Sequence, residues 1–508
     1  MRFFYPNISY LLPFLLLVLG PLASAASAQP VFKNKVFKNK VFKNEKAIVF
    51  ETMDGQKTDA FEGFIEVPEN RSQPRNRMIP VQYVRFPATG SVKDASTTRS
   101  PIIYLSGGPG GSGIQTARYP GFRYPLFMAL RQHGDVIALD QRGTGASKIV
   151  DKCQSGQHIP LTEAVTDQQL TALYQRAAQT CVKQWTEQGV DVNGYTTVES
   201  AHDIDDLRRH LKADKVVLWG ISYGSHLALA SLKEIPNSID KLVIASAEGL
   251  NQTVKLPART DAYFQRLQMA INTQPAAAAA YPDIKALMTR VHRQLEVKPE
   301  RLAIPVKDGD PVDLLFQRYH MQILASSMIA DPHRGVPTLL SLYSDLDNGV
   351  YGALTQVLQR GYFSDAEISF ELMPLAMDVA SGITDERLDL VNQQAKSSLL
   401  GLVLNFPMPH LNKEIVGLDL GDKFRIEAVS DVPTLLVTGT LDGRTYIDAQ
   451  VEATAGLSAL THVMVENAGH NVFMRSPEVT EVIHQFLNGD DITKERIIIK
   501  LPEFLPAG

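Results

Sequence analysis

The chain has 508 residues, of which 44% are apolar and 21% are charged, and its formal net charge is −5. This is the composition of a globular protein that is long enough for one large core with an insertion, or for two domains. The small net charge argues against a nucleic-acid-binding protein and against a basic membrane-binding surface.

The first 28 residues are typical of a secretory signal peptide. Arg2 precedes the apolar run 11–19, and small residues follow in two A-x-A patterns, at 23–25 and 26–28. The apolar run is short for a membrane span, and no cysteine follows it that could carry a lipid. We expect an exported protein, periplasmic or extracellular, without stable membrane association after signal cleavage. An uncleaved anchor is the alternative.

Residues 29–47 contain three copies of a five-residue repeat, at 31–35, 36–40 and 41–45. Three copies of five residues are too short to form a repeat fold. We therefore expect a mobile N-terminal arm here.

Residues 48–249 alternate strand-like and helix-like segments. Buried or alternating apolar runs predict strands, and one stretch with a charged face predicts a helix. The expected strands are 64–68, 79–86, 102–105, 136–139, 215–219 and 241–245, and the expected helix is 198–211. Such alternation favours a mostly parallel sheet that is covered on both faces.

The pattern becomes helical over residues 250–425. Helices are expected at 262–271, 284–295, 314–329, 337–346, 354–358 and 385–400. Strand patterns return at 434–437 and 462–465, followed by an amphipathic helix at 477–487. We expect an α/β core in two parts, 48–249 and 426–490, with a helical cap between them and a tail at 491–508. An independent helical domain would leave the core without its last strands.

The chain has two cysteines, Cys153 and Cys181. Export to an oxidising compartment favours a disulfide between them, and two free buried thiols are the alternative. Neither has histidine or further cysteine partners at zinc-site spacing, so no metal site is expected.

The sequence Gly220-Ile221-Ser222-Tyr223-Gly224 lies between an apolar run, 215–219, and a helix-like run, 225–230. A strand, G-x-S-x-G and a helix are the layout of a nucleophile elbow. Small residues are needed on both sides of the serine because the turn is tight, and the serine takes a strained conformation. Ser222 is therefore the predicted nucleophile.

A serine nucleophile needs a base, and the base needs an orienting acid. Asp442 follows the strand-like run 434–438, and His470 follows the next one, 462–465. The order Ser, Asp, His is that of α/β-hydrolases. Asp442 and His470 are thus the predicted acid and base, and Glu248, after an earlier strand, is the competing acid position.

The tetrahedral intermediate needs two N–H donors. Tyr223, which follows the nucleophile, supplies one. Gly108 is the predicted second donor, because Pro109 has no N–H, and Gly107 or Gly110 is the alternative. The glycine run has no P-loop lysine, and no dinucleotide fingerprint is present, so we expect no cofactor.

Three motifs together resemble the prolyl iminopeptidase and tripeptidyl aminopeptidase family of α/β-hydrolases. They are the glycine loop 105–113, the segment 140–147 and the elbow 220–224. The resemblance extends from about Phe61 to Leu487, and the helical insertion is similar to the cap of the tripeptidyl aminopeptidase branch.

The resemblance implies that carboxylates of the cap bind the free N-terminus of a peptide substrate. Asp378 is the first candidate, with Glu371 and Glu248 behind it. Two positions depart from the family pattern. Ser106 stands where prolyl iminopeptidases often have histidine, and Val379 stands near where relatives often have cysteine.

The expected function is that of an exported serine aminopeptidase acting on peptides, without nucleic-acid partners. A carboxylic-ester hydrolase with the same machinery is the alternative, because one constellation serves both bonds. A non-catalytic binding protein on this fold would be expected to lack a member of the triad, and none is missing.

Overall fold

A computed structural model describes residues 41–73, 77–90, 99–306, 310–363 and 367–505. The expected signal peptide and the first two repeats lie outside these residues. None of the helices in the described part of the chain is long and apolar enough to cross a membrane.

The described residues form a ten-stranded sheet with the order β1-β2-β3-β5-β4-β7-β8-β12-β13-β14. The first three strands are antiparallel to their neighbours, and the pairs from β5 to β14 are parallel. The expected mostly parallel sheet is therefore confirmed. The strands are β1 (Lys46–Glu51), β2 (Lys57–Pro68), β3 (Met78–Phe86), β4 (Ile102–Leu105), β5 (Val136–Leu139), β7 (Val216–Ile221), β8 (Ile239–Ala245), β12 (Thr434–Gly439), β13 (Leu460–Glu466) and β14 (Arg496–Ile498).

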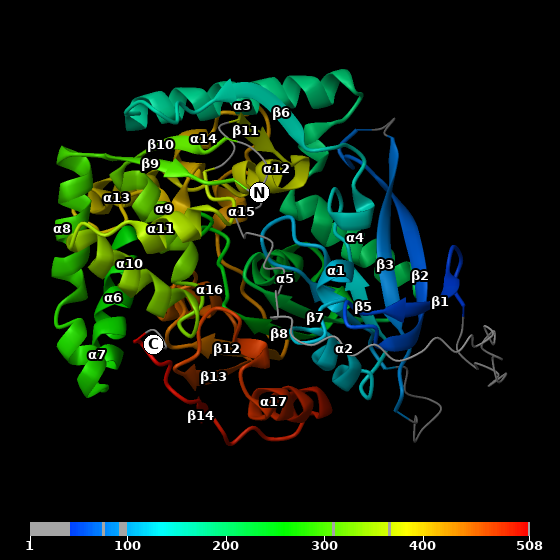
Figure 1. The fold of residues 1–508 in the computed structure, drawn as a ribbon. Helices are drawn as coiled ribbons and strands as arrows, with labels where there is room; N and C mark the ends of the chain where they lie inside the picture. The colour runs from blue at the N-terminus through cyan, green and yellow to red at the C-terminus, as the bar shows by residue number, and fades with distance from the viewer. Residues whose placement is uncertain (1–40, 74–76, 91–98, 307–309, 364–366, 506–508) are drawn as a thin grey trace, which may run out of the picture.

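Helices cover both faces of this sheet (Figure 1). Side chains of a strand alternate between faces, so β7 contributes to two cores. Leu218 packs in one core with residues of α4 (Thr197–His210) and α5 (Tyr223–Glu234). Trp219 packs in the other with residues of α2 (Tyr124–Leu130) and α17 (Pro477–Asn488). Both faces are apolar because both are covered.

A largely helical segment lies between β8 and β12 and has a core of its own, which includes Tyr263, Val291 and Leu340. Its helices are α6 (Pro257–Asn272), α7 (Pro275–Ala280), α8 (Ile284–Val297), α9 (Arg318–Met328), α10 (Gly335–Asp347), α11 (Gly352–Leu358), α12 (Leu372–Ser381), α13 (Asp385–Ala395), α14 (Met408–Leu411) and α15 (Asp422–Arg425). We refer to this segment as the cap.

The cap differs from the expected helices in several places: α7, α12, α14 and α15 were not expected, and the helix expected at 385–400 ends at Ala395. The helix expected at 314–329 begins as strand β10 (Val312–Phe316), which forms a hairpin with β9 (Glu300–Ile304), and α9 starts only at Arg318. Leu314 and Phe316 are buried in the cap core on alternate positions, a pattern that a helical interpretation overlooks. Helix α12 was not expected, although it supplies Asp378.

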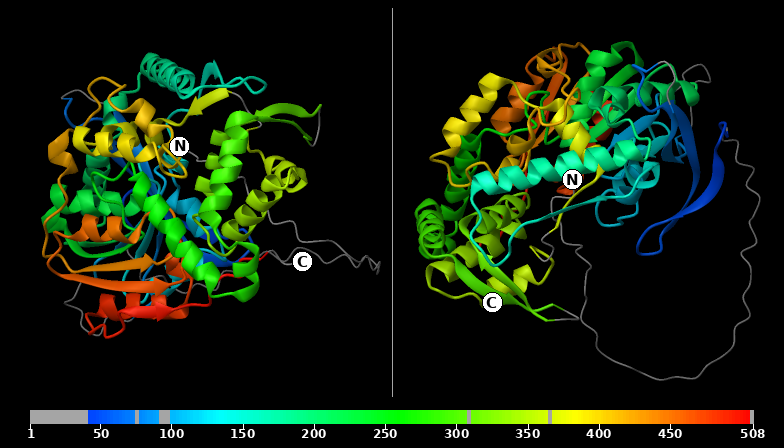
Figure 2. Two further views of the ribbon diagram at one scale, coloured as in Figure 1. Left: turned by 90° about the vertical axis from the view of Figure 1, so that its left-hand side faces the viewer. Right: turned by 90° about the horizontal axis from the view of Figure 1, so that it is seen from above.

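One segment of the core's first part joins the cap. Strand β6 (Cys153–His158) pairs with β11 (Glu367–Phe370), and α3 (Asp167–Glu187) packs against both strands and α14. Figure 2 shows α3 as a long cyan helix across the molecule in the view from above. Cys153 and Cys181 form a disulfide that ties β6 to α3.

The two chain ends contribute more structure than expected. Strand β1 begins at Lys46, inside the expected arm of 29–47, and Glu45 forms a buried ion pair with Arg85 at 2.6 Å. The expected tail contributes edge strand β14, because Ile497 buries its side chain in the core beside β13. A three-residue strand is too short to show periodicity in sequence.

We expect the disulfide to stabilise the chain, because it closes a loop with a sequence separation of 28. In the chain-entropy model, replacing both Cys153 and Cys181 by serine lowers the free energy of unfolding by about 3–4 kcal/mol. Denaturant unfolding with and without dithiothreitol measures this loss. The double variant should not respond to the reductant. An unchanged midpoint in wild-type protein that thiol titration shows to be reduced would contradict the prediction.

Candidate active site

Ser222 forms a strained turn between β7 and α5. Its φ is 54° and its ψ is −127°, a region that costs a residue with a side chain about 1–3 kcal/mol. The chain can close this tightly because glycines flank the turn. A Cβ added to Gly224 would lie 2.0 Å from the carbonyl oxygen of Leu105, and one added to Gly220 would lie 2.5 Å from that of Gly224. The packing of α5 on β4 and β7 thus determines the conformation of Ser222.

Asp442 and His470 lie together at the ends of β12 and β13. The Nδ1 atom of His470 is 3.1 Å from both carboxylate oxygens of Asp442. The amides of Arg444 and Thr445 also donate to this carboxylate, at 2.8 and 2.9 Å. Burial pushes the pKa of Asp442 upward, but His470 and these donors bring it below its ordinary value. Nδ1 of His470 therefore carries the hydrogen, which leaves Nε2 as a proton acceptor.

The end of β8 holds the nucleophile and the histidine loop side by side. The Ser222 amide donates to the Ala245 carbonyl at 3.2 Å, and the Ser246 hydroxyl donates to the His470 carbonyl at 2.7 Å. Among the described residues, no hydrogen bond joins the Ser222 hydroxyl to His470. Contacts of this kind often tighten only when substrate binds. Ser246 was missed in the sequence because it belongs to no motif.

The glycine loop after β4 lies against the elbow. A Cβ added to Gly107 would meet the Cβ of Ser222 at 3.1 Å. Gly108 has a φ of 130°, which favours glycine. Gly110 lies beneath Pro374 of α12, so the cap contacts the loop directly. The amide of Tyr223, the first residue of α5, belongs to the N-terminal helical turn, whose N–H groups have no acceptor within the helix.

Two of the three predicted substrate carboxylates lie beside the elbow. Asp378 of α12 and Glu248 after β8 are both 7% exposed. Burial raises the pKa of Asp378 to about 7, and the charge of Glu248 contributes to this rise. The Tyr223 hydroxyl contacts the sulfur of Met377, the residue before Asp378, and the Glu248 amide donates to the hydroxyl of Ser225 on α5 at 2.9 Å. Burial also raises the pKa of Tyr223, and the two carboxylates add to that shift.

Lys255 was not expected at this site. Its Nζ lies 2.7 Å from Oε2 of Glu248, so the lysine offsets the charge of that carboxylate. Asn405 of the cap exchanges two hydrogen bonds with the Lys255 backbone, at 2.5 and 2.6 Å. No motif marks Lys255 or Asn405, because their contact depends on the folding of the cap.

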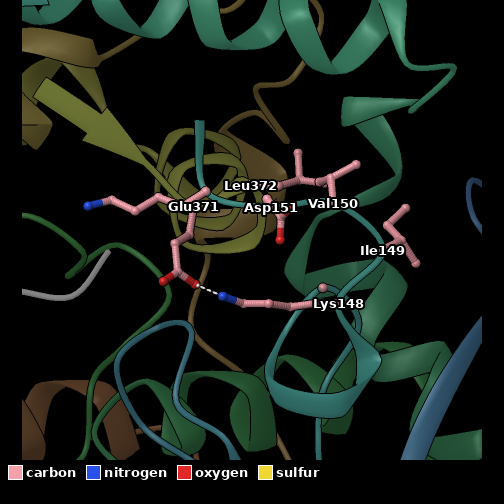
Figure 3. Close-up of a pocket in the computed structure, with 8 residues that line it drawn as sticks. Lys148, Ile149, Val150, Asp151, Glu371 and Leu372 are labelled. Atoms are coloured by element: carbon pink, nitrogen blue, oxygen red, sulfur yellow. Dashed lines mark ion pairs between the residues drawn. The ribbon is translucent and has the colours of Figure 1, made fainter. Parts of the chain in front are cut away.

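The third predicted carboxylate, Glu371, is engaged elsewhere. It precedes α12 and forms an ion pair with Lys148 at 2.8 Å, in a pocket that Ile149, Val150 and Leu372 help to line (Figure 3). Seven residues separate Glu371 from Asp378, a rise of about 10 Å along a helix. Glu371 therefore lies at the opposite end of α12 from Ser381.

A family model described as alpha/beta hydrolase fold matches residues 100–302. The match runs from the start of β4 into β9 and includes the elbow. Together with the large, mostly parallel sheet between helical layers, it shows that the chain has the α/β-hydrolase fold.

Curated relatives extend the resemblance to serine peptidases. Serine protease Hip1 of Mycobacterium tuberculosis is 28% identical over 191 residues, which are 36% of this chain and 35% of the relative. Tripeptidyl aminopeptidase of Streptomyces lividans is 24% identical over 189 residues, 36% of this chain and 34% of the relative. The chain thus matches about a third of the length of these relatives. The expected resemblance to the tripeptidyl aminopeptidases is confirmed.

We predict that Gly224→Ala destabilises the protein. The new Cβ would lie 2.0 Å from the Leu105 carbonyl oxygen, so α5 and β4 must separate, at a cost of about 1–3 kcal/mol. Thermal unfolding measures the shift. Gly352→Ala is the matched control, since its Cβ would meet nothing within 4 Å. Equal melting temperatures for Gly224→Ala and wild type would show that the close approach is not as described.

Proposed function

We propose that the chain is an exported serine hydrolase that cleaves peptide bonds near free N-termini, as a prolyl or tripeptidyl aminopeptidase does. The position of Asp378 carries the proposal: this buried cap carboxylate follows Met377, whose sulfur contacts the hydroxyl of Tyr223, the residue after the nucleophile. The similarity to tripeptidyl aminopeptidases supports the same activity.

The proposed chemistry uses Ser222, His470 and Asp442 as a triad. Nε2 of His470 takes the proton of the Ser222 hydroxyl as its oxygen attacks the scissile carbonyl, and the same proton then passes to the leaving amine. Asp442 stabilises the imidazolium that forms. Water repeats the sequence on the acyl-enzyme and releases the acid. The amides of Gly108 and Tyr223 are the proposed donors to the oxyanion.

The proposed amine subsite is centred on Asp378. A protonated N-terminus forms a charge-assisted hydrogen bond with a carboxylate, and such bonds are strong when buried. Lys255 already offsets the charge of Glu248 at 2.7 Å, which makes Asp378 the carboxylate that responds to the incoming cation. The Asp378 carboxylate thus sets the preference for an unblocked N-terminus.

Export is part of the proposal and rests on residues 1–28 and on the disulfide. Disulfides persist in oxidising compartments outside the cytosol, and this one ties β6 to α3.

We expect Ser222→Ala to abolish turnover and labelling by a fluorophosphonate probe while the protein stays folded, because the nucleophile is lost. Asp442→Asn should lower kcat by about 10⁴-fold, because the imidazole loses its orienting anion. Ser231→Ala is the matched control: this serine is buried on the same helix and donates to the Leu227 carbonyl. Labelling of the Ser222→Ala protein at wild-type rate would refute the assignment.

We further expect the preference for free over acetylated N-termini to depend on pH. A pKa of about 7 means that Asp378 is charged above pH 7 and neutral below it. The ratio of kcat/KM for free and acetylated peptides should therefore fall roughly tenfold per pH unit below 7. Using the ratio cancels the effects of pH that both substrates share.

Asp378→Asn should remove both the preference and its pH dependence. Asp385→Asn, an exposed carboxylate of the same cap, is the control and should keep both. Equal cleavage of free and acetylated peptides by wild type would remove the aminopeptidase proposal. Activity on short acyl esters without any on peptides would favour the carboxylic-ester hydrolase.

A further inference from the structure

We propose that His226 is a positioning residue that aligns the two carboxylate-bearing segments of the amine subsite with the nucleophile helix. The inference rests on the proposed function, since it assigns His226 a role in binding the substrate amine. His226 lies on α5, four residues after Ser222, and its side chain has no solvent exposure.

Both ring nitrogens of His226 are used, and each binds a different segment. Nδ1 lies 3.1 Å from the carbonyl oxygen of Gly249, the residue after Glu248. Nε2 lies 3.1 Å from the hydroxyl of Ser381, one helical turn after Asp378 on α12. A single imidazole therefore connects the nucleophile helix, the loop after β8 and the cap.

The chemistry of the partners sets the tautomer. A carbonyl can only accept, so Nδ1 carries the hydrogen and Nε2 accepts from the Ser381 hydroxyl. Burial lowers the pKa of His226, which keeps the ring neutral and preserves this arrangement. An apolar ring of similar size would fill the space but would leave the Gly249 carbonyl and the Ser381 hydroxyl without this partner.

The same ring also supports Tyr223. The two rings are stacked with their centroids 5.5 Å apart, and the Tyr223 hydroxyl contacts Thr197 and the sulfur of Met377 on α12. Thr197 in turn lies 3.3 Å from the Ser381 hydroxyl. These contacts connect Tyr223 and Thr197 to α12 as well. A displacement of His226 is therefore expected to move Asp378 relative to the elbow.

The test is a split between binding and chemistry. His226→Phe should raise KM for free-amine peptides at least about tenfold, because small displacements of binding groups are costly. Turnover of p-nitrophenyl acetate, which has no amine, should change far less than KM for free-amine peptides does. Ser381→Ala removes one partner of His226, together with the contact of that hydroxyl to Thr197. It should show the same split, which keeps the proposal testable if the phenylalanine variant does not fold.

Two conservative variants separate the two contacts. An asparagine amide reaches the position of Nδ1, and a glutamine amide reaches that of Nε2. His226→Gln should restore much of the affinity for free amines, because it keeps the contact to α12 and Asp378. His226→Asn keeps only the contact to Gly249 and should restore less.

His292→Phe is the matched control. His292 is a buried cap histidine that contacts the Tyr343 hydroxyl at 2.7 Å, so its loss tests general destabilisation. It should leave KM unchanged.

If wild type prefers free amines and His226→Phe and Ser381→Ala keep that preference, the inference is overturned and the proposed function stands. A parallel loss of ester turnover would also overturn it. If wild type shows no preference for free amines, both the inference and the proposed function are overturned.

Discussion

The close approach of α5 to β4 and β7 is the constraint on which the site depends. Gly224 lies against the carbonyl of Leu105, and Gly220 lies against Gly224, so neither position accepts a Cβ. This contact forces Ser222 into a positive φ and makes Tyr223 the first residue of a helix. The strain of the turn is offset by burial of α5 against the sheet, where most of its residues are fully covered.

The cap supplies the chemistry that the core lacks. Its helix α12 carries Asp378 and places Pro374 on the glycine loop, so one helix contacts both sides of the nucleophile. The cap has its own hydrophobic core, and it is also joined to the first part of the chain through the β6–β11 pair. The disulfide between Cys153 and Cys181 strengthens that junction. The cap is therefore attached to the core both through α12 on the glycine loop and through the β6–β11 pair.

The charge balance of the site follows from burial. Two carboxylates close together in a low-dielectric region cannot both stay ionised without a partner. Lys255 is that partner for Glu248, while burial raises the pKa of Asp378 to about 7 with a smaller contribution from the charge of Glu248. A neutral, fully buried histidine holds both segments without adding charge. In the proposed amine subsite, the Glu248–Lys255 pair carries no net charge, which leaves Asp378 to balance an incoming ammonium group.

The sequence alone predicted the elbow, the order of Ser222, Asp442 and His470, and a mostly parallel sheet. Each of these predictions was assembled from short local patterns. Strand periodicity, glycine spacing and strand ends are local signals. The carboxylates of the cap came from family resemblance, and of these only Asp378 and Glu248 lie beside Tyr223. Tertiary structure alone decided the partners: Lys255 for Glu248, Lys148 for Glu371, Ser246 for the His470 loop, and His226 for two segments 23 and 155 residues away. Such contacts have no local pattern, since they arise only when the chain folds and brings these side chains within hydrogen-bond distance.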